Sequence, residues 1–215
     1  MTAIGKKSTI NKFRTMKRIF SSFLIIFFIC FPINSLVAAY SSDPEKFITE
    51  IIEEAKIILN SEDTKQIKAE KLSAIAINTV DVKGIGYYTL GKKRKEISPD
   101  QKKKYEDLFE DYFLKSFTSR LTDYSDPKIS VLSAEKINEK YTIVKSMLLK
   151  TDKKPEVKID WRVYTKNPEK PLIRDLIIEG LSLARTQKEE FASILSANNN
   201  DINVLFKKLE EFVNK

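Results

Sequence analysis

The sequence predicts an α+β fold, in which helices pack on one face of a curved antiparallel sheet of four strands. Apolar residues recur at helical spacing over two long segments of the first half, residues 44–60 and 99–124. The spacing then changes to alternation over four consecutive short segments. No helical pattern separates these segments, which favours an antiparallel sheet over a Rossmann-type sheet. Helical spacing returns after residue 185.

The first 39 residues have the composition of an export signal. They contain six basic residues and no acidic residue, followed by a mostly apolar run from Ile19 to Phe31. Pro32 ends the run, and Val37-Ala38-Ala39 offers small residues for cleavage. Residues 1–39 are therefore expected to be a cleaved secretory signal peptide. The alternative is an uncleaved membrane anchor, but the apolar run is shorter than the roughly 20 residues that a spanning helix needs.

Residues 40–215 are expected to fold as one domain. All 30 acidic residues of the chain lie in this part, whereas six of the 38 basic residues of the chain lie in residues 1–39. The net charge is therefore +8 for the whole chain and +2 for residues 40–215. Lys and Glu are interspersed, which argues against a nucleic-acid-binding face. Two basic runs, residues 92–95 and 102–104, stand out. They indicate either a solvated loop and helix start or a docking patch for an acidic partner or an anionic membrane surface.

Two helices are expected before residue 80. Asp43-Pro44 is typical of an N-cap followed by proline at the first helical position, and the helix after it ends near Asn60. A second helix is expected from Thr64 to about Asn78. Residues 79–91 contain three of the five glycines of the chain, which indicates turns or a broken helix.

The clearest helix start in the sequence is at Ser98. Ser98, Pro99 and Gln101 have the spacing of a capping box, in which side chain and backbone satisfy each other's free polar groups. The helix is expected to continue to about Tyr124, with aromatic residues dominating its apolar stripe. The stripe consists of Tyr105, Leu108, Phe109, Tyr112, Phe113, Phe117, Leu121 and Tyr124.

Four strands with alternating apolar residues are expected after this helix. They cover residues 129–131, 141–149, 157–163 and 173–178. The polar segments between them, residues 134–139, 151–155 and 166–171, predict hairpins. A turn at Glu179-Gly180 ends the last strand, a helix follows from about Arg185 to Leu195, and Asp201 caps a final helix.

Several kinds of chemistry are missing from the sequence. It contains no histidine, and its only cysteine, Cys30, lies in the expected signal peptide. The commonest general base and transition-metal ligand are therefore missing, and we expect no metal and no cofactor. Three carboxylates, Asp160, Asp175 and Glu179, leave a hydrolase as an alternative, because glycoside hydrolysis needs only two acids. Alternation places Asp160 on the outer face of its strand, so we expect that the protein is not an enzyme.

Three segments resemble, in order, the MlaC family of periplasmic phospholipid-binding proteins, also called the toluene-tolerance family. Leu90–Asp126 has the family's Leu-Gly, its Ser-Pro-x-Gln helix start and its Phe-rich helix. Lys158–Val163, with the sequence KIDWRV, resembles the family's strand with a Trp-Arg pair. Asp175–Leu183 resembles the pattern Asp-apolar-x-x-Glu-Gly-apolar-Ser-apolar. The resemblance covers nearly all of residues 43–213.

The resemblance implies a function in lipid transport. Members of the family carry glycerophospholipid through the periplasm, between an outer-membrane lipoprotein complex and an inner-membrane ABC transporter with an MCE-domain ring. This transport maintains the lipid asymmetry of the outer membrane. The alternative is a periplasmic protein that binds another apolar lipid, such as a hopanoid. Neither function involves nucleic acid.

A lipid carrier needs an apolar pocket, because each buried CH₂ group contributes ~0.8 kcal/mol. The expected lipid-binding side chains come from the aromatic helix, the last two strands and the segment after Gly180. They are Phe109, Phe113, Phe117, Ile159, Trp161, Val163, Ile177, Leu181 and Leu183. The resemblance implies that Leu181 and Leu183 line the pocket. For the other residues, a place in the hydrophobic core is the alternative.

Overall fold

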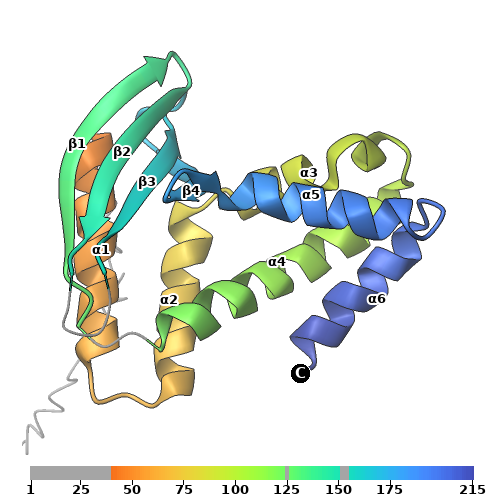
Figure 1. The fold of residues 1–215 in the computed structure, drawn as a ribbon, viewed down its shortest axis with the longest axis horizontal. Helices are drawn as coiled ribbons and strands as arrows, with labels where there is room; N and C mark the ends of the chain where they lie inside the picture. Colours follow the sequence, from red (N-terminus) through yellow and green to blue (C-terminus); the bar gives the residue numbers. More distant parts are fainter. Residues whose placement is uncertain (1–39, 124–125, 151–154) are drawn as a thin grey trace, which may run out of the picture. The chain divides into compact units, whose positions relative to one another are not determined.

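A computed structural model describes residues 40–123, 126–150 and 155–215 (Figure 1). The expected signal peptide, residues 1–39, lies outside the described residues, as does most of the expected hairpin at residues 151–155. The described residues form six α-helices, one 3-10 helix and one sheet, which confirms the α+β class. None of the helices in these ranges is long and apolar enough to cross a membrane.

Helices α1 (Pro44–Asn60) and α2 (Lys65–Thr79) form where the sequence predicts them. Each begins at a side chain that caps its first turn. The Asp43 carboxylate accepts a hydrogen bond from the backbone N–H of Lys46, and the Thr64 hydroxyl accepts one from the N–H of Ile67. These caps satisfy backbone donors that have no partner within the helix.

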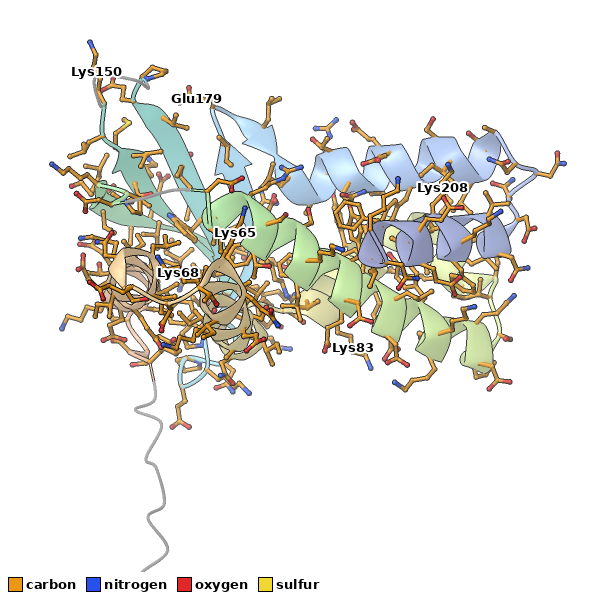
Figure 2. All side chains as sticks on the ribbon, turned by 90° about the horizontal axis from the view of Figure 1, so that it is seen from below. Lys65, Lys68, Lys83, Lys150, Glu179 and Lys208 are labelled. Carbon is orange, nitrogen blue, oxygen red and sulfur yellow. The ribbon has the colours of Figure 1, made fainter. Side chains whose placement is uncertain are left out.

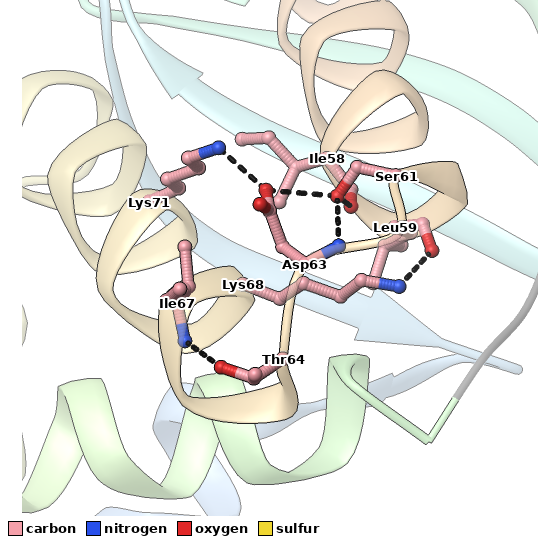
Figure 3. A network of polar contacts seen from close by, with 8 residues as sticks. All are labelled: Ile58, Leu59, Ser61, Asp63, Thr64, Ile67, Lys68 and Lys71. Atoms are coloured by element: carbon pink, nitrogen blue, oxygen red, sulfur yellow. Dashed lines mark hydrogen bonds and ion pairs between the residues drawn. The ribbon is translucent and has the colours of Figure 1, made fainter.

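A small polar network holds the turn between α1 and α2 (Figure 3). Lys71 Nζ lies 2.5 Å from the Asp63 carboxylate, which also accepts a hydrogen bond from Ser61 Oγ. Lys68 Nζ donates to the carbonyl of Leu59 at 2.8 Å. The hydrogen bond from Lys71 lowers the pKa of Asp63, so this carboxylate is charged at neutral pH.

Helix α3 (Val82–Leu90) occupies the segment in which the sequence predicts turns. Asp81 caps it by accepting a hydrogen bond from the N–H of Gly84 at 2.9 Å. A Cβ atom at Gly84 would lie 2.3 Å from the Asp81 carboxylate, and one at Gly86 would lie 2.8 Å from the ring of Phe109. Of the two predicted alternatives, the broken helix is confirmed, since residues 80–81 separate α2 from α3. The turns are wrong, because these two glycines allow close packing inside a regular helix.

Helix α4 (Pro99–Leu121) follows a short 3-10 helix, η1 (Gly91–Lys95). Gly91 has a φ of +59°, which favours glycine, and it ends α3. The capping box of α4 is confirmed: Ser98 Oγ accepts from the N–H of Gln101 at 3.2 Å, and Gln101 Oε1 accepts from the N–H of Ser98 at 3.0 Å. The helix ends three residues before the expected Tyr124, which lies outside the described residues.

The sheet contains five antiparallel strands in sequence order, one more than expected. They are β1 (Ile129–Asn138), β2 (Tyr141–Leu148), β3 (Val157–Tyr164), β4 (Leu172–Ile178) and β5 (Leu181–Ser182). The expected loop at residues 134–139 belongs largely to β1, since Ala134, Glu135 and Lys136 pair with β2. Its polar composition reflects exposure, because β1 is exposed from Leu132 to its end.

The strand register divides the side chains between two faces of the sheet. Residues directly opposite each other in antiparallel strands share a face. Val144, Trp161 and Leu176 form one row on the inner face, and Ser146, Ile159 and Ile178 form the next row. This face is the inner one because Val144 belongs to the core that the helices cover. Asp160 lies on the outer face, in a row with Lys145 and Ile177.

The last two helices pack against the earlier ones. Helix α5 (Leu183–Ser196) begins directly after β5 and runs alongside α3, and α6 (Ile202–Val213) packs on α4 (Figure 1). Asp201 caps α6, as the sequence predicts, by accepting from the N–H of Asn203 at 3.0 Å. Phe191 and Leu205 are buried in the same core as the helices of the first half.

Candidate functional site

The exposure of the inner face rises from one end of the sheet to the other. Val163 and Ile173 pair at the closed end, where they are 0% and 4% exposed. Trp161, in the next row, is half-buried, and so are Ile159 and Ile178 beyond it. Leu181, opposite Ile178, is 68% exposed. Lys150 and Glu179 mark this open end of the sheet in Figure 2.

The indole of Trp161 is fixed to the sheet by hydrogen bonds. Its Nε1–H donates to Ser146 Oγ at 2.9 Å, and Ser146 Oγ donates to the carbonyl of Ile159 at 2.9 Å. Ser146 is completely buried. The polar atom of the indole is thus satisfied inside the sheet, and the rest of the ring is available as an apolar wall. Ser146 is not among the residues predicted from the sequence, although its position two residues after Val144 places it on the inner face.

Aromatic rings of α4 form a continuous stack along the helix. The ring centroids of Tyr105 and Phe109 are 5.7 Å apart, those of Phe109 and Phe113 are 6.3 Å apart, and those of Phe113 and Phe117 are 6.0 Å apart. Tyr105 and Phe109 are buried, and burial raises the pKa of Tyr105. Phe113, Phe117 and Leu121 pack against the core but stay partly exposed. The stack therefore leads from the core to accessible apolar surface.

The nine residues predicted to bind lipid differ in their placement. Phe109 and Val163 are core residues, since they are 2% and 0% exposed. Phe113, Phe117, Ile159 and Trp161 are half-buried, whereas Leu181 and Leu183 are exposed at the start of α5. The ninth residue, Ile177, points away from this set.

The placement of Ile177 on the inner face is wrong because β4 contains a bulge. Val163 pairs with Ile173 and Arg162 with Asp175, so Arg174 is an extra residue in β4. An extra residue moves every later side chain of the strand to the other face. Ile177 therefore lies on the outer face, and its neighbours Leu176 and Ile178 occupy the inner one.

Asp175 fixes the segment that carries the two exposed leucines. Its Oδ2 accepts a hydrogen bond from Ser182 Oγ at 2.6 Å, and its Oδ1 accepts one from the N–H of Ala184 at 3.0 Å. Gly180, with a φ of +81°, permits the turn between β4 and β5. Both oxygens of this buried carboxylate are engaged in holding the backbone at the start of α5. These bonds give Asp175 a structural role at the start of α5.

A small cavity between α3 and α4 lies elsewhere in the fold. It has a volume of about 160 Å³, and Val82, Gly86 and Phe109 are among its lining residues. Its rim is polar, with Lys83 Nζ lying 2.8 Å from the Glu106 carboxylate. Pockets for small ligands typically have volumes of about 300–1,000 Å³, so this cavity does not suit a molecule of phospholipid size.

Comparisons with known proteins identify a family for this chain and a solved structure with a similar fold. The model of the family described as MlaC protein matches residues 47–211. The fold is similar to that of the phospholipid-binding protein from Ralstonia solanacearum, solved in complex with a phospholipid, with a TM-score of 0.68 and 18% sequence identity. The similarity covers 80% of this chain and 97% of that chain. No curated protein sequence matches the chain. The chain belongs to the MlaC family.

Proposed function

We propose that this protein is a periplasmic phospholipid carrier. The observation that carries the proposal is a set of half-buried apolar side chains, Ile159 and Trp161 on the inner face of the sheet and Phe113 and Phe117 on α4. Apolar side chains that stay partly exposed are stabilised when a ligand removes their surface from water. Membership of the MlaC family and the phospholipid in the similar solved structure support a lipid as the ligand.

The surface has the properties that acyl chains require. Each CH₂ group that it removes from water contributes ~0.8 kcal/mol, and no charged partner is needed. The exposed Leu181 of β5 and Leu183, the first residue of α5, add apolar surface beside Ile178 at the open end. Asp175 holds both leucines in place through Ser182 and Ala184. Acyl chains would therefore lie along the inner face, with these leucines at the rim.

Membership of the family and the N-terminal sequence support a proposed location and proposed partners. Residues 1–39 act as a cleaved export signal, and the domain formed by residues 40–215 works in the periplasm. It carries glycerophospholipid between an outer-membrane lipoprotein complex and an inner-membrane ABC transporter with an MCE-domain ring. In this function the protein binds and releases lipid without changing it chemically.

A matched pair of substitutions tests the proposal. Ile159 and Ile177 are both half-buried isoleucines on neighbouring strands, but they lie on opposite faces of the sheet. Ile159→Glu puts a charge where the acyl chains lie, and an unpaired charge is costly in an apolar site. We expect this variant to lose at least about 90% of its co-purified phospholipid, as one uncompensated charge opposes binding by several kcal/mol. Ile177→Glu is expected to retain the lipid.

The measurement is mass spectrometry of the organic extract of each exported protein, with circular dichroism to establish that both variants fold. Phospholipid in the wild-type extract that disappears only in Ile159→Glu supports the proposal. A wild-type extract with a hopanoid in place of phospholipid would assign the same surface to a different lipid. Equal phospholipid in both folded variants would exclude the inner face as the site. Leu181→Glu is a weaker test, because a charge at this exposed position stays in solvent.

A further inference from the structure

The positive charge of the mature chain is concentrated in one segment. Residues 91–104 contain seven Lys and Arg residues and two acidic residues, a net charge of +5. Residues 40–215 as a whole carry only +2, so the rest of the domain is negative by three charges. The domain therefore has a strong charge asymmetry, which orients a protein near a charged surface.

The local structure spreads these cations over the surface. Gly91 ends α3, and η1 then places four consecutive basic residues on a helix with about three residues per turn. Lys92, Arg94 and Lys95 are exposed, and no ion pair involves them within the described residues. By contrast, Lys93 pairs with Glu96 at 3.2 Å. The unpaired cations are available for an external anionic partner.

Two further elements place lysines beside α3, the helix that leads into η1. Lys102, in the first turn of α4, has its Nζ 4.8 Å from the ring centroid of Tyr87. Lys188 of α5 has its Nζ 4.9 Å from the ring centroid of Tyr88, which is 43% exposed. Neither lysine takes part in an ion pair within the described part of the chain. An exposed tyrosine beside a lysine, as in Tyr88 and Lys188, is typical of surfaces that lie at a membrane interface.

We propose that this surface docks on an anionic phospholipid bilayer. It is called the basic corner and comprises Lys92, Arg94, Lys95, Lys102, Lys188 and Tyr88. Most of its cations are lysines, which act as separate, flexible point charges and do not need the planar, bidentate geometry that suits arginine. Such charges suit a continuous layer of headgroup phosphates better than a single carboxylate-bearing protein site.

The proposal goes beyond lipid binding and is independent of it. None of the apolar inner-face residues belongs to the basic corner, so docking and lipid binding can be tested separately. Each Lys or Arg near an anionic bilayer contributes ~1 kcal/mol. Reversing three charges is therefore expected to lower vesicle binding by at least about 100-fold.

Co-sedimentation with vesicles tests the docking surface. The exported protein is mixed with vesicles of phosphatidylglycerol in phosphatidylcholine, and with vesicles of phosphatidylcholine alone, at low and high salt. The test variant carries Lys92→Glu, Arg94→Glu and Lys95→Glu. The control variant carries Lys140→Glu, Lys166→Glu and Lys170→Glu, which makes the same charge change at exposed residues of the β1–β2 and β3–β4 connections.

We expect the wild type and the control variant to sediment with the anionic vesicles only, and salt to weaken this binding by screening. The test variant should remain in the supernatant while keeping its co-purified phospholipid. Equal binding by the test and control variants would overturn the proposal. Equal binding of the wild type to anionic and to neutral vesicles would also overturn it. Wild-type binding to a polyglutamate peptide but not to vesicles would assign the basic corner to an acidic protein instead. A wild type that carries phospholipid but binds no vesicle would refute docking and leave the lipid-carrier function standing.

Discussion

Gly86 shows how a single residue decides the packing of two helices. The ring of Phe109 lies against the backbone of Gly86 and contacts the rings of Tyr105, Phe113 and Phe191. The Tyr105 hydroxyl also donates to the carbonyl of Gly86 at 3.1 Å. Any side chain at position 86 would separate α3 from the aromatic stack, so the close approach of the two helices depends on this glycine.

Gly86→Ala is therefore expected to destabilise the protein, although Ala favours a helix by up to ~1 kcal/mol over Gly. The new Cβ atom would lie 2.8 Å from the Phe109 ring, which is buried and cannot move freely. Overpacking of this kind costs about 1–3 kcal/mol, and subtracting the helix-propensity gain leaves a net loss of up to about 2 kcal/mol in the free energy of unfolding by urea. In a Phe109→Leu background the clash is smaller, and the same substitution should become neutral or stabilising. A Gly86→Ala protein that is as stable as the wild type would contradict this account.

The roles of single residues could be predicted from the sequence where they depend on neighbours in the chain. Roles that depend on contacts with distant residues could not. The caps at Asp43, Ser98 and Asp201 are confirmed because each side chain bonds a backbone N–H two or three residues away. Gly86 and Ser146 could not be assigned in this way. Gly86 contacts a residue 23 positions along the chain, and Ser146 accepts its hydrogen bond from Trp161 on the next strand.

The bulge in β4 is a feature of a whole strand that also depends on distant contacts and could not be predicted from the sequence. Arg174, the extra residue, donates to the Asp81 carboxylate at 2.6 Å and to the Tyr141 hydroxyl at 3.0 Å, and it stacks on the ring of Tyr164. These contacts tie β4 to the start of α3 and to the neighbouring strands. Alternation in the sequence predicted the strand but not the extra residue, so Ile177 was assigned to the wrong face. The bulge also places Asp175 where it reaches α5.

Asp175→Ala is expected to loosen the start of α5. The substitution removes both acceptors, so the hydroxyl of Ser182 and the N–H of Ala184 lose their partners. Each unsatisfied buried group costs about 1–3 kcal/mol, and we expect a loss of roughly 2–4 kcal/mol in the free energy of unfolding. Hydrogen exchange should accelerate at the amides of the first turn of α5 under native conditions.

Asp160→Ala is the matched control for this prediction. Asp160 is also a largely buried carboxylate on a neighbouring strand, but its Oδ1 has no hydrogen-bond partner and its Oδ2 lies 3.5 Å from Lys158 Nζ. Removal of a poorly satisfied group should be neutral or slightly stabilising. Unchanged exchange in α5 of the Asp175→Ala protein would show that this carboxylate does not hold the segment.

At the scale of the whole domain, the α+β class could be predicted because the spacing of apolar residues in helices and strands does not depend on how these elements pack. The change from helical spacing to alternation near residue 128 marks the passage from α4 to the sheet. The candidate site could be predicted only in part, because a buried and a half-exposed apolar residue have the same pattern in a sequence. Phe109 and Phe117 occupy equivalent positions of one stripe, yet only Phe109 is buried in the core.

Because some of the apolar residues are only half-buried, we expect that removal of a bound lipid lowers the thermal stability of the protein. A lipid that covers Phe117, Ile159 and Trp161 binds the folded state but not the unfolded chain, and such a ligand stabilises the fold by ~2.7 kcal/mol at 100 times its Kd. For a domain of this size, each kcal/mol shifts the Tm by about 2–4 °C, so we expect a decrease of about 5–10 °C on delipidation. Calorimetry of the purified, delipidated and reloaded protein measures the shift, and reloading should restore the original Tm. The Ile159→Glu protein is the control, since its Tm should not respond to added phospholipid. If the delipidated wild type melts at the same temperature as the loaded protein, the half-buried apolar surface does not hold a lipid.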